Sequence, residues 1–142
     1  MHLILGFGAT GASFLRYTRK NKIPVIIFDT RDNPPGLTEF EDFNEEIYSG
    51  DFDLNAFPNI DKILVSPGID FKAPILVEAK NKGIKIQTDI ELFVEDSSSL
   101  KFLVTGTNGK TSVVSMTKHV LSKLFPKSKI IYCGNIGNPA LD

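Results

Sequence analysis

Two short glycine-rich runs carry the residues that could bind phosphate groups. The first, GFGATG, places Gly6, Gly8 and Gly11 in the spacing G-x-G-x-x-G directly after an apolar run. In this pattern the first glycine allows a tight turn, the second lets a phosphate approach the backbone, and the third lets a helix pack closely on a strand. The start of the helix then offers unpaired N–H groups to an anion. Asp29 lies 18 residues beyond Gly11, where a carboxylate can accept hydrogen bonds from a ribose or a base. The first loop therefore predicts a nucleotide site without specifying the nucleotide.

The second run, VTGTNGKTS, covers Val104 to Ser112. A P-loop is usually spaced G-x-x-x-x-G-K-[ST], whereas here Gly106 stands only three residues before Gly109. The context of an apolar run, a glycine turn and a helical pattern nevertheless matches a P-loop. Lys110 can reach β- and γ-phosphate oxygens, and Thr111 can ligate a bridging Mg²⁺. We interpret the run as a shortened, competent phosphate loop; the alternative is a capped helix after a glycine turn.

Apolar runs alternate with helix-patterned stretches along the chain, which is typical of a parallel α/β sheet. This pattern predicts five strands and three helices before a polar linker at 96–101. The expected strands cover 2–7, 25–29, 46–50, 62–68 and 84–88, and the expected helices cover 10–21, 74–81 and 89–96, with Asp89 near the N-cap of the third.

Beyond the linker the pattern restarts, with an expected strand at 101–106, a helix at 110–124 and a strand at 129–134. We therefore expect a Rossmann-like five-stranded parallel sheet with flanking helices over residues 1–95. Residues 96–142 would be the first βαβ unit of a second, P-loop domain. Because such a unit alone has no sheet to join, we expect it to expose an apolar face and to self-associate.

Bulk composition excludes several classes of partner. The formal net charge of -1 gives no electrostatic reason to propose nucleic acid or a membrane surface as a partner. No apolar run approaches the ~20 residues needed to span a bilayer. The single cysteine, Cys133, fits a reducing compartment, and the two histidines form no zinc-binding pattern. We expect a cytoplasmic protein.

The run TGTNGKTS resembles the ATP loop of the Mur ligase and folylpolyglutamate synthase superfamily. Five further runs, GFGATG, DTRDNPPG, SPGI, DIELF and GNIG, occur in the order typical of its D-glutamate-adding, MurD-type family. The resemblance extends from Leu5 to Leu141. It implies a three-domain ligase that joins D-glutamate to UDP-MurNAc-L-Ala through an acyl phosphate, using ATP and Mg²⁺ in peptidoglycan precursor synthesis.

The resemblance also implies roles for individual residues. Lys110 and Thr111 would be catalytic, with Thr111 ligating Mg²⁺. The implied ATP-binding residues are Gly106, Thr107, Asn108, Gly109, Lys110, Thr111 and Ser112. The implied UDP-sugar-binding residues are Gly8, Ala9, Thr10, Gly11, Asp29, Thr30, Arg31, Ser66, Pro67, Gly68 and Asn135.

Other functions stay open at this point. An NAD-dependent oxidoreductase would explain the first loop and Asp29 but not the second loop. A MurC-type ligase would share the ATP loop, although DTRDNPPG and DIELF favour the MurD type. The family's remaining metal ligands, its modified lysine and its D-glutamate-binding domain would lie beyond residue 142. We therefore expect the chain alone to bind a UDP-sugar without catalysis, and to need the missing downstream domains of the same protein.

Overall fold

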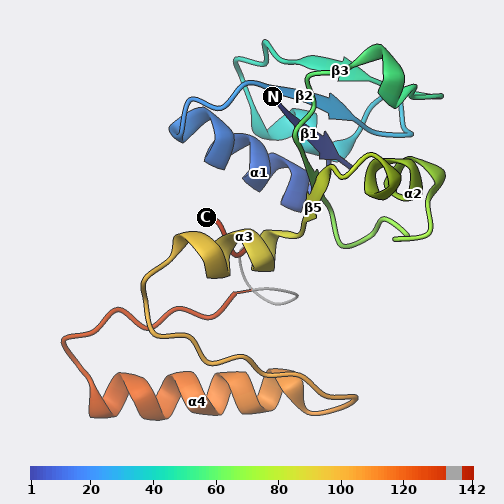
Figure 1. Cartoon of the computed structure of the whole chain (residues 1–142). Coiled ribbons are helices and arrows are strands. Elements are labelled where there is room, and N and C mark those ends of the chain that lie inside the picture. Colours follow the sequence, from blue (N-terminus) through green and yellow to red (C-terminus); the bar gives the residue numbers. More distant parts are fainter. Residues whose placement is uncertain (134–138) are drawn as a thin grey trace.

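A computed structural model of the chain describes residues 1–133 and 139–142. Its centre is a five-stranded parallel sheet in the order β3-β2-β1-β4-β5 (Figure 1). All five predicted strands form, but each ends before its predicted last residue. At the first strand the reason is visible, since Gly6 leaves the extended conformation with a φ of 85°. The strands are β1 (His2–Leu5), β2 (Val25–Phe28), β3 (Glu46–Tyr48), β4 (Lys62–Val65) and β5 (Lys85–Gln87).

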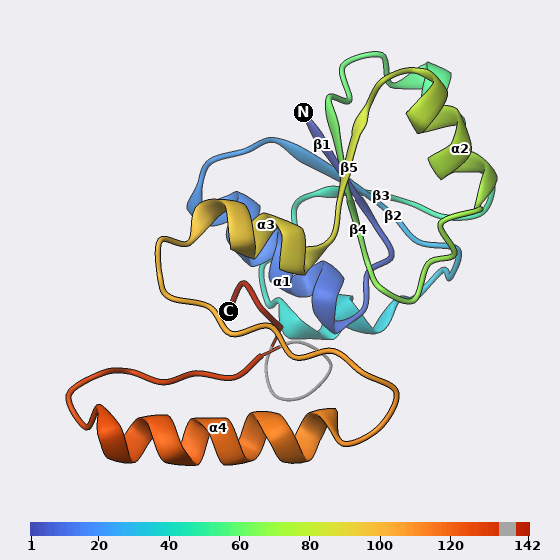
Figure 2. The same ribbon diagram turned by 60° about the horizontal axis from the view of Figure 1, so that its bottom comes forward.

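Helices cover both faces of this sheet, as a buried parallel sheet requires (Figure 2). Successive strand residues point to opposite faces, so Leu3 and Leu5 join one core cluster and Ile4 joins the other. On the Ile4 face lie α1 (Ala9–Lys20) and α3 (Asp89–Asp96); on the other lies α2 (Pro74–Asn81). Two 3₁₀ turns, η1 (Pro35–Glu39) and η2 (Leu54–Ala56), also belong to this first part of the chain, which extends from β1 to α3.

The start of α3 differs slightly from the prediction. Thr88, not Asp89, is the N-cap, and its hydroxyl accepts a hydrogen bond from the backbone N–H of Glu91. The Glu91 carboxylate in turn accepts from the Thr88 N–H at 2.8 Å. This reciprocal capping box stabilises the helix end by about 1 kcal/mol. Asp89 is the first helical residue.

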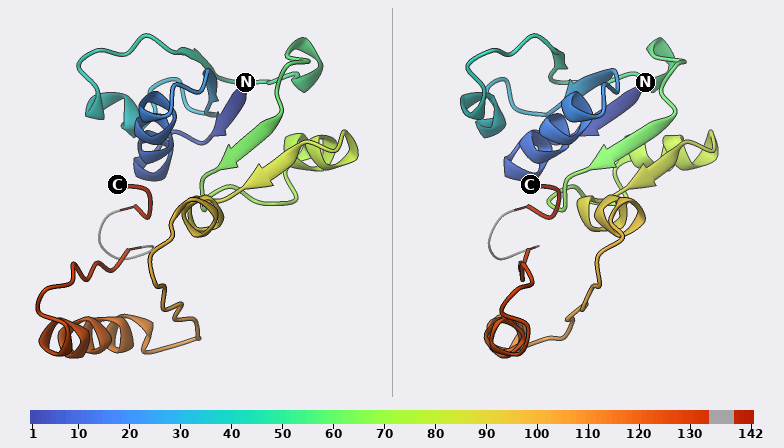
Figure 3. Two further views of the ribbon diagram at one scale, coloured as in Figure 1. Left: turned by 60° about the vertical axis from the view of Figure 1, so that its left-hand side comes forward. Right: turned by 90° about the vertical axis from the view of Figure 1, so that its left-hand side faces the viewer.

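The second part of the chain contains one helix, α4 (Lys110–Leu124), which matches its predicted bounds. The strands predicted on either side of it do not form: residues 101–109 and 125–133 hold only an isolated bridge residue, Cys133. Gly134, the last residue of the second predicted strand, lies outside the described residues. A strand needs neighbours for its backbone N–H and C=O groups, and no described strand lies alongside either segment. Figure 3 shows α4 set apart from the sheet.

Large apolar side chains are consequently exposed in this second part, as the sequence predicted. Leu100 is 85% exposed, and Leu103 is 76% exposed. Within α4 the exposed apolar residues recur at helical spacing and form one stripe, the α4 apolar stripe: Val113, Met116, Val120 and Leu124. Among the described helices, none is both long and apolar enough to cross a lipid bilayer.

Candidate nucleotide-binding site

Three of the predicted site segments meet at one edge of the sheet. They are Gly8–Gly11, Asp29–Arg31 and Ser66–Gly68, which follow β1, β2 and β4. These strands are neighbours, and parallel strands end at the same edge. The chain adds β2 and β3 on one side of β1, then β4 and β5 on the other. Ligands of open α/β sheets bind at such a reversal, beyond the carboxyl ends of the strands.

The first glycine loop has a geometry that suits a phosphate. Gly8 is the N-cap of α1, and a Cβ built on it would meet no atom within 4 Å. The space beside Gly8 is therefore open at the N-terminus of a helix, where N–H groups and the helix dipole favour an anion. Gly11 has the opposite environment, because a Cβ there would lie 2.3 Å from the carbonyl oxygen of Gly6. Gly11 is thus required by the packing of α1 on the loop.

Two further residues brace this loop. The Ser66 hydroxyl donates a hydrogen bond to the Gly6 carbonyl at 2.7 Å. The Gly36 N–H donates to the Phe7 carbonyl at 2.9 Å, and a Cβ on Gly36 would approach that oxygen to 2.8 Å. From the sequence, Gly36 has no predicted role of its own and stands only as the last residue of the run DTRDNPPG.

Asp29 is buried, and its carboxylate is fully occupied by donors of the chain itself. One oxygen accepts from the Phe7 N–H at 2.6 Å and from Nη2 of Arg31 at 2.7 Å. The other accepts from the backbone N–H and Nε of Arg31, at 3.0 and 2.8 Å. Two oxygens offer about four acceptor positions, and all four are used. Hydrogen bonding from Arg31, with a smaller contribution from Phe7, lowers the pKa of Asp29 to about 2, against the opposing effect of burial.

This arrangement changes what the segment after β2 offers to a ligand. Asp29 fixes the first loop through Phe7 and orients the guanidinium of Arg31, whose side chain is 54% exposed. Thr30 is also exposed. The exposed groups of this segment are therefore the donors of the Arg31 guanidinium and the hydroxyl of Thr30, while the Asp29 carboxylate is buried beneath them.

The second glycine loop forms a tight turn before α4. Gly109 is the N-cap in the left-handed conformation, with a φ of 77°, which favours glycine. The Lys110 ammonium folds back over the turn and donates to the carbonyls of Gly106 and Thr107. Gly106, Thr107, Asn108, Thr111 and Ser112 are exposed. The structure thus gathers the predicted ATP-loop residues around one turn, in a part of the chain separate from the sheet.

The predicted protein ligand for a magnesium–nucleotide is the hydroxyl of Thr111. Thr111 stands in the first turn of α4, next to Lys110. Among the described residues, no group of three or more His, Cys, Asp or Glu side chains could hold a metal ion. Mg²⁺ commonly binds through substrate phosphates, water and one or two protein ligands, so this donor set is compatible with it.

Asn135, the remaining predicted site residue, lies outside the described residues.

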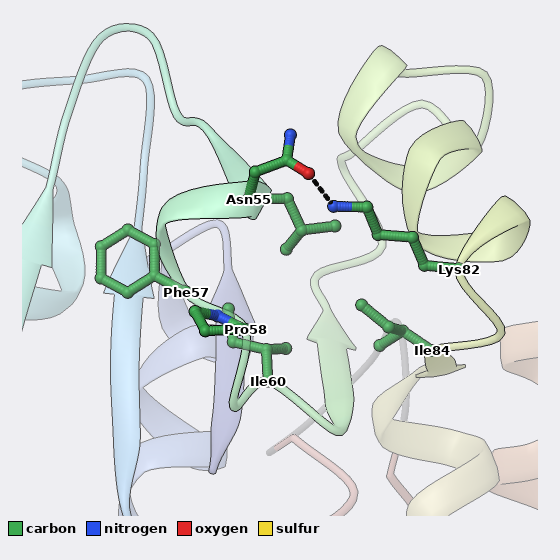
Figure 4. Close-up of a pocket in the computed structure, with 7 residues that line it drawn as sticks. Asn55, Phe57, Pro58, Ile60, Lys82 and Ile84 are labelled. Carbon is green, nitrogen blue, oxygen red and sulfur yellow. Dashed lines mark hydrogen bonds between the residues drawn. The ribbon is translucent and has the colours of Figure 1, made fainter.

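A separate hollow of about 330 Å³ lies at the opposite edge of the sheet (Figure 4). Ile60 and Ile84, which line it, precede β4 and β5. Its one cationic group, Lys82, already pairs with the Glu78 carboxylate at 2.8 Å and with the Asn55 side chain. The remaining lining residues are Leu54, Phe57 and Pro58. Because its charge is satisfied and it is far along the strands from the glycine loop, this hollow is not the candidate site.

A parallel α/β sheet with a glycine loop at its order reversal defines a Rossmann-like domain. Residues 1–88 match the family described as Mur ligase MurD-like, N-terminal domain. The chain therefore belongs to the MurD-like branch of the Mur ligase family.

Relatives with curated names extend the similarity across the second glycine loop. UDP-N-acetylmuramoylalanine–D-glutamate ligase of Aliivibrio fischeri is 37% identical over 142 residues, covering 99% of this chain and 32% of that protein. The enzyme of the same name from Pseudomonas aeruginosa is 31% identical, covering 99% of this chain and 31% of that protein. The chain thus spans about a third of the length of these relatives.

Solved structures of other Mur ligases share the fold. UDP-N-acetylmuramate-alanine ligase MurC from Thermotoga maritima has a TM-score of 0.53 at 20% identity, covering 87% of this chain and 29% of that one. The UDP-N-acetylmuramate:L-alanyl-gamma-D-glutamyl-meso-diaminopimelate ligase from Neisseria meningitides has a TM-score of 0.55 at 23% identity, covering 87% of this chain and 39% of that one. At these identities the likeness concerns the fold alone.

Proposed function

We propose that this chain is the amino-terminal part of an ATP-dependent UDP-N-acetylmuramoylalanine–D-glutamate ligase. The observation that carries the proposal is that similarity to ligases of that name covers 99% of the chain, including both glycine loops. In this reading the first part holds UDP-MurNAc-L-Ala, and the second glycine loop begins the ATP site. D-glutamate and the completion of the active site would involve further domains of the same protein. Use of ATP supports a cytoplasmic location.

The first site would bind the UDP-sugar through donors on three loops. The open space at Gly8 and the α1 N-terminus would receive the diphosphate, with Ala9 and Thr10 beside it. Thr30 and Arg31 would face the uridine, with Arg31 held in place by Asp29. The loop Ser66–Gly68, together with Asn135, would border the rest of the substrate.

The second site would bind ATP with Mg²⁺. Lys110 would leave the carbonyls of Gly106 and Thr107 for the phosphates, and Thr111 would contribute its hydroxyl to the metal. A cation and a metal at this position offset the charge that develops when a carboxylate attacks the γ-phosphate. The carboxylate would thereby take the γ-phosphoryl group and release ADP. The amine of D-glutamate would then attack the acyl carbon of this acyl phosphate, forming the amide and releasing inorganic phosphate.

The state of Asp29 disfavours an NAD-dependent oxidoreductase. NAD-binding domains of this type use a carboxylate after the second strand to accept hydrogen bonds from ribose hydroxyls. Here the carboxylate has no acceptor position left, and Arg31 presents donors that suit carbonyl or phosphate oxygens. A MurC-type ligase shares the fold, but the curated relatives described above favour D-glutamate addition.

Ligand-induced shifts of the thermal midpoint test the first site. UDP and UMP should raise the midpoint of the chain, whereas NAD should leave it unchanged. Gly8→Ala should fold normally, because its Cβ has space and its φ is -96°, but should lose the UDP shift because the methyl group occupies the phosphate position. A midpoint raised by NAD and not by UDP would overturn the proposal.

We further expect no ADP formation dependent on D-glutamate and UDP-MurNAc-L-Ala from the chain alone.

A further inference from the structure

The last four residues of the chain, Pro139–Asp142, lie against α1. Of these four, Ala140, Leu141 and Asp142 border a hollow of about 640 Å³ together with the end of α3. Ala140 is 7% exposed, and Leu141 packs against the core cluster that contains Phe14 and Leu92. This segment is therefore docked on the first part of the chain, although it follows the second glycine loop and α4 in sequence.

Asp142 makes the polar contacts of this docked segment. One carboxylate oxygen accepts from the Ser13 hydroxyl at 2.8 Å and from Nε of Arg16 at 3.0 Å. The other accepts from Nη2 of Arg16 at 2.6 Å. Ser13 is fully buried, and the Asp142 side chain is 19% exposed. Such a two-pronged arginine–carboxylate contact fixes orientation as well as distance.

The remaining nitrogen of Arg16 ties this contact to the first part of the chain. Its Nη1 donates to the carboxylate of Glu39 at 2.8 Å, and Glu39 is the last residue of η1, the turn that carries Gly36. Arg16 thus joins three segments: α1, the η1 turn that braces the first glycine loop, and the segment that follows α4. Arg19, one turn further along α1, instead pairs with Glu45 and Asp42, which precede β3.

We propose that Arg16 is a positioning residue, which holds the segment that follows α4 on α1 through Asp142 and Ser13. Because α1 begins at the first glycine loop, this contact relates the segment after α4 to the helix of the first candidate site. The docking itself is independent of which ligands bind; only its consequence for catalysis rests on the proposed function.

The single thiol of the chain reports on this docking. Cys133 is half-buried, and burial together with the nearby Asp89 carboxylate raises its pKa. Asp89 belongs to α3, so the thiol lies close to the first part of the chain. Release of Pro139–Asp142 should therefore expose it. We expect Arg16→Gln and Asp142→Asn each to speed alkylation of Cys133 by iodoacetamide about threefold or more, because the thiol reacts when its segment opens.

The controls separate docking from a general loss of stability. Arg19→Gln removes a matched arginine of α1, and Glu39→Gln removes only the other partner of Arg16; both should keep the wild-type alkylation rate. The double variant Arg16→Gln/Asp142→Asn should react no faster than the faster single variant, since both changes break one contact. Arg16→Lys should restore part of the protection.

The proposal is overturned if Arg16→Gln and Asp142→Asn react at the wild-type rate, or if Arg19→Gln accelerates the reaction equally. It is also overturned if the two single effects simply multiply in the double variant. UDP titration of the same variants reads the first site separately. Failure of UDP binding would leave the thiol result standing, and an unchanged thiol rate would leave the UDP result standing.

Discussion

The two glycine loops have similar local sequences but very different surroundings. The first is enclosed by a sheet: Gly11 touches Gly6, Gly36 touches Phe7, and Ser66 bonds to the Gly6 carbonyl. The second stands before an isolated helix, and its lysine bonds only to carbonyls of the same turn. A glycine loop is therefore shaped by its own residues but held in place by its neighbours.

The difference follows from strand pairing. Both loops come after apolar runs, yet only the first run has partners on both sides, β2 and β4. Burying a strand without partners leaves backbone groups unpaired, at a cost comparable to a lost hydrogen bond for each group. The first glycine loop is therefore fixed by its neighbours, and the second has the turn without such a framework.

The largest expected effect comes from filling the contact between Gly11 and Gly6. Gly11→Ala should destabilise the first part by about 3 kcal/mol or more, because its methyl group would overlap a backbone carbonyl that cannot move freely. Urea unfolding followed by far-UV circular dichroism measures the change. Gly109→Ala in the second loop, where the Cβ has space but φ is positive, should leave unfolding of the sheet unchanged. Equal losses in the two variants would show that the loops do not differ as described.

Acid titration should show an intermediate effect on the stability of the part that holds the first glycine loop. The pKa of Asp29 falls from its ordinary value of 3.8 to about 2 on folding. The folded state thus favours the charged form, so the stabilisation is present above about pH 4 and is lost as the pH falls towards about 2. We expect Asp29 to contribute about 1 to 2 kcal/mol through this linkage, allowing for the exposure of Arg31.

Asp29→Asn isolates this contribution from that of other carboxylates. The stability difference between wild type and variant should shrink between pH 5 and pH 2.5, both measured by urea unfolding. Helix α4 contains no acidic residue, so amide exchange within it should show no matching step. A difference that stays constant over this range would contradict the assignment of the low pKa to Asp29.

Lysine substitutions in the α4 apolar stripe should have the smallest effect on stability. Their effect on self-association should be large. Met116→Lys and Val120→Lys should change the free energy of unfolding by less than about 0.5 kcal/mol, because both side chains are already exposed. They should reduce self-association in sedimentation velocity over a range of concentrations. Leu76→Lys, in the buried face of α2, should instead unfold the first part. A wild-type chain that remains monomeric at every concentration would exclude a role for the stripe in association.

Much of the fold could be predicted from the sequence because local patterns and packing agree in the first part. The apolar runs of β1, β2 and β4 alternate between two covered faces, and Pro74 and Gly83 mark the ends of the segment around α2. Helix α4 was also predicted within its observed bounds. The flanking segments at 101–106 and 129–134 carry the same apolar signal as true strands. Pairing depends on neighbours, which no local pattern contains.

From the candidate site, the glycine spacing and Asp29 at the end of the second strand could be read in the sequence, and Ser66 came only from the family resemblance. That the segments after β1, β2 and β4 meet at one edge follows from the strand order of the fold. Phe7 and Arg31 occupy the acceptor positions of the Asp29 carboxylate. This depends on distances between loops, which the spacing of residues along the chain does not reveal. The contact between Arg16 and Asp142, 126 residues apart, is likewise a product of the fold.

The contact of Gly36 with the first loop has a consequence for protein engineering. Asp29 and Gly36 both contact the first glycine loop, although they belong to a different crossover. An attempt to change this loop by grafting only residues 6–11 from another protein would set new side chains against unaltered contacts at Asp29 and Gly36. Residues 6–11 and the stretch from Asp29 to Gly36 should therefore be exchanged together.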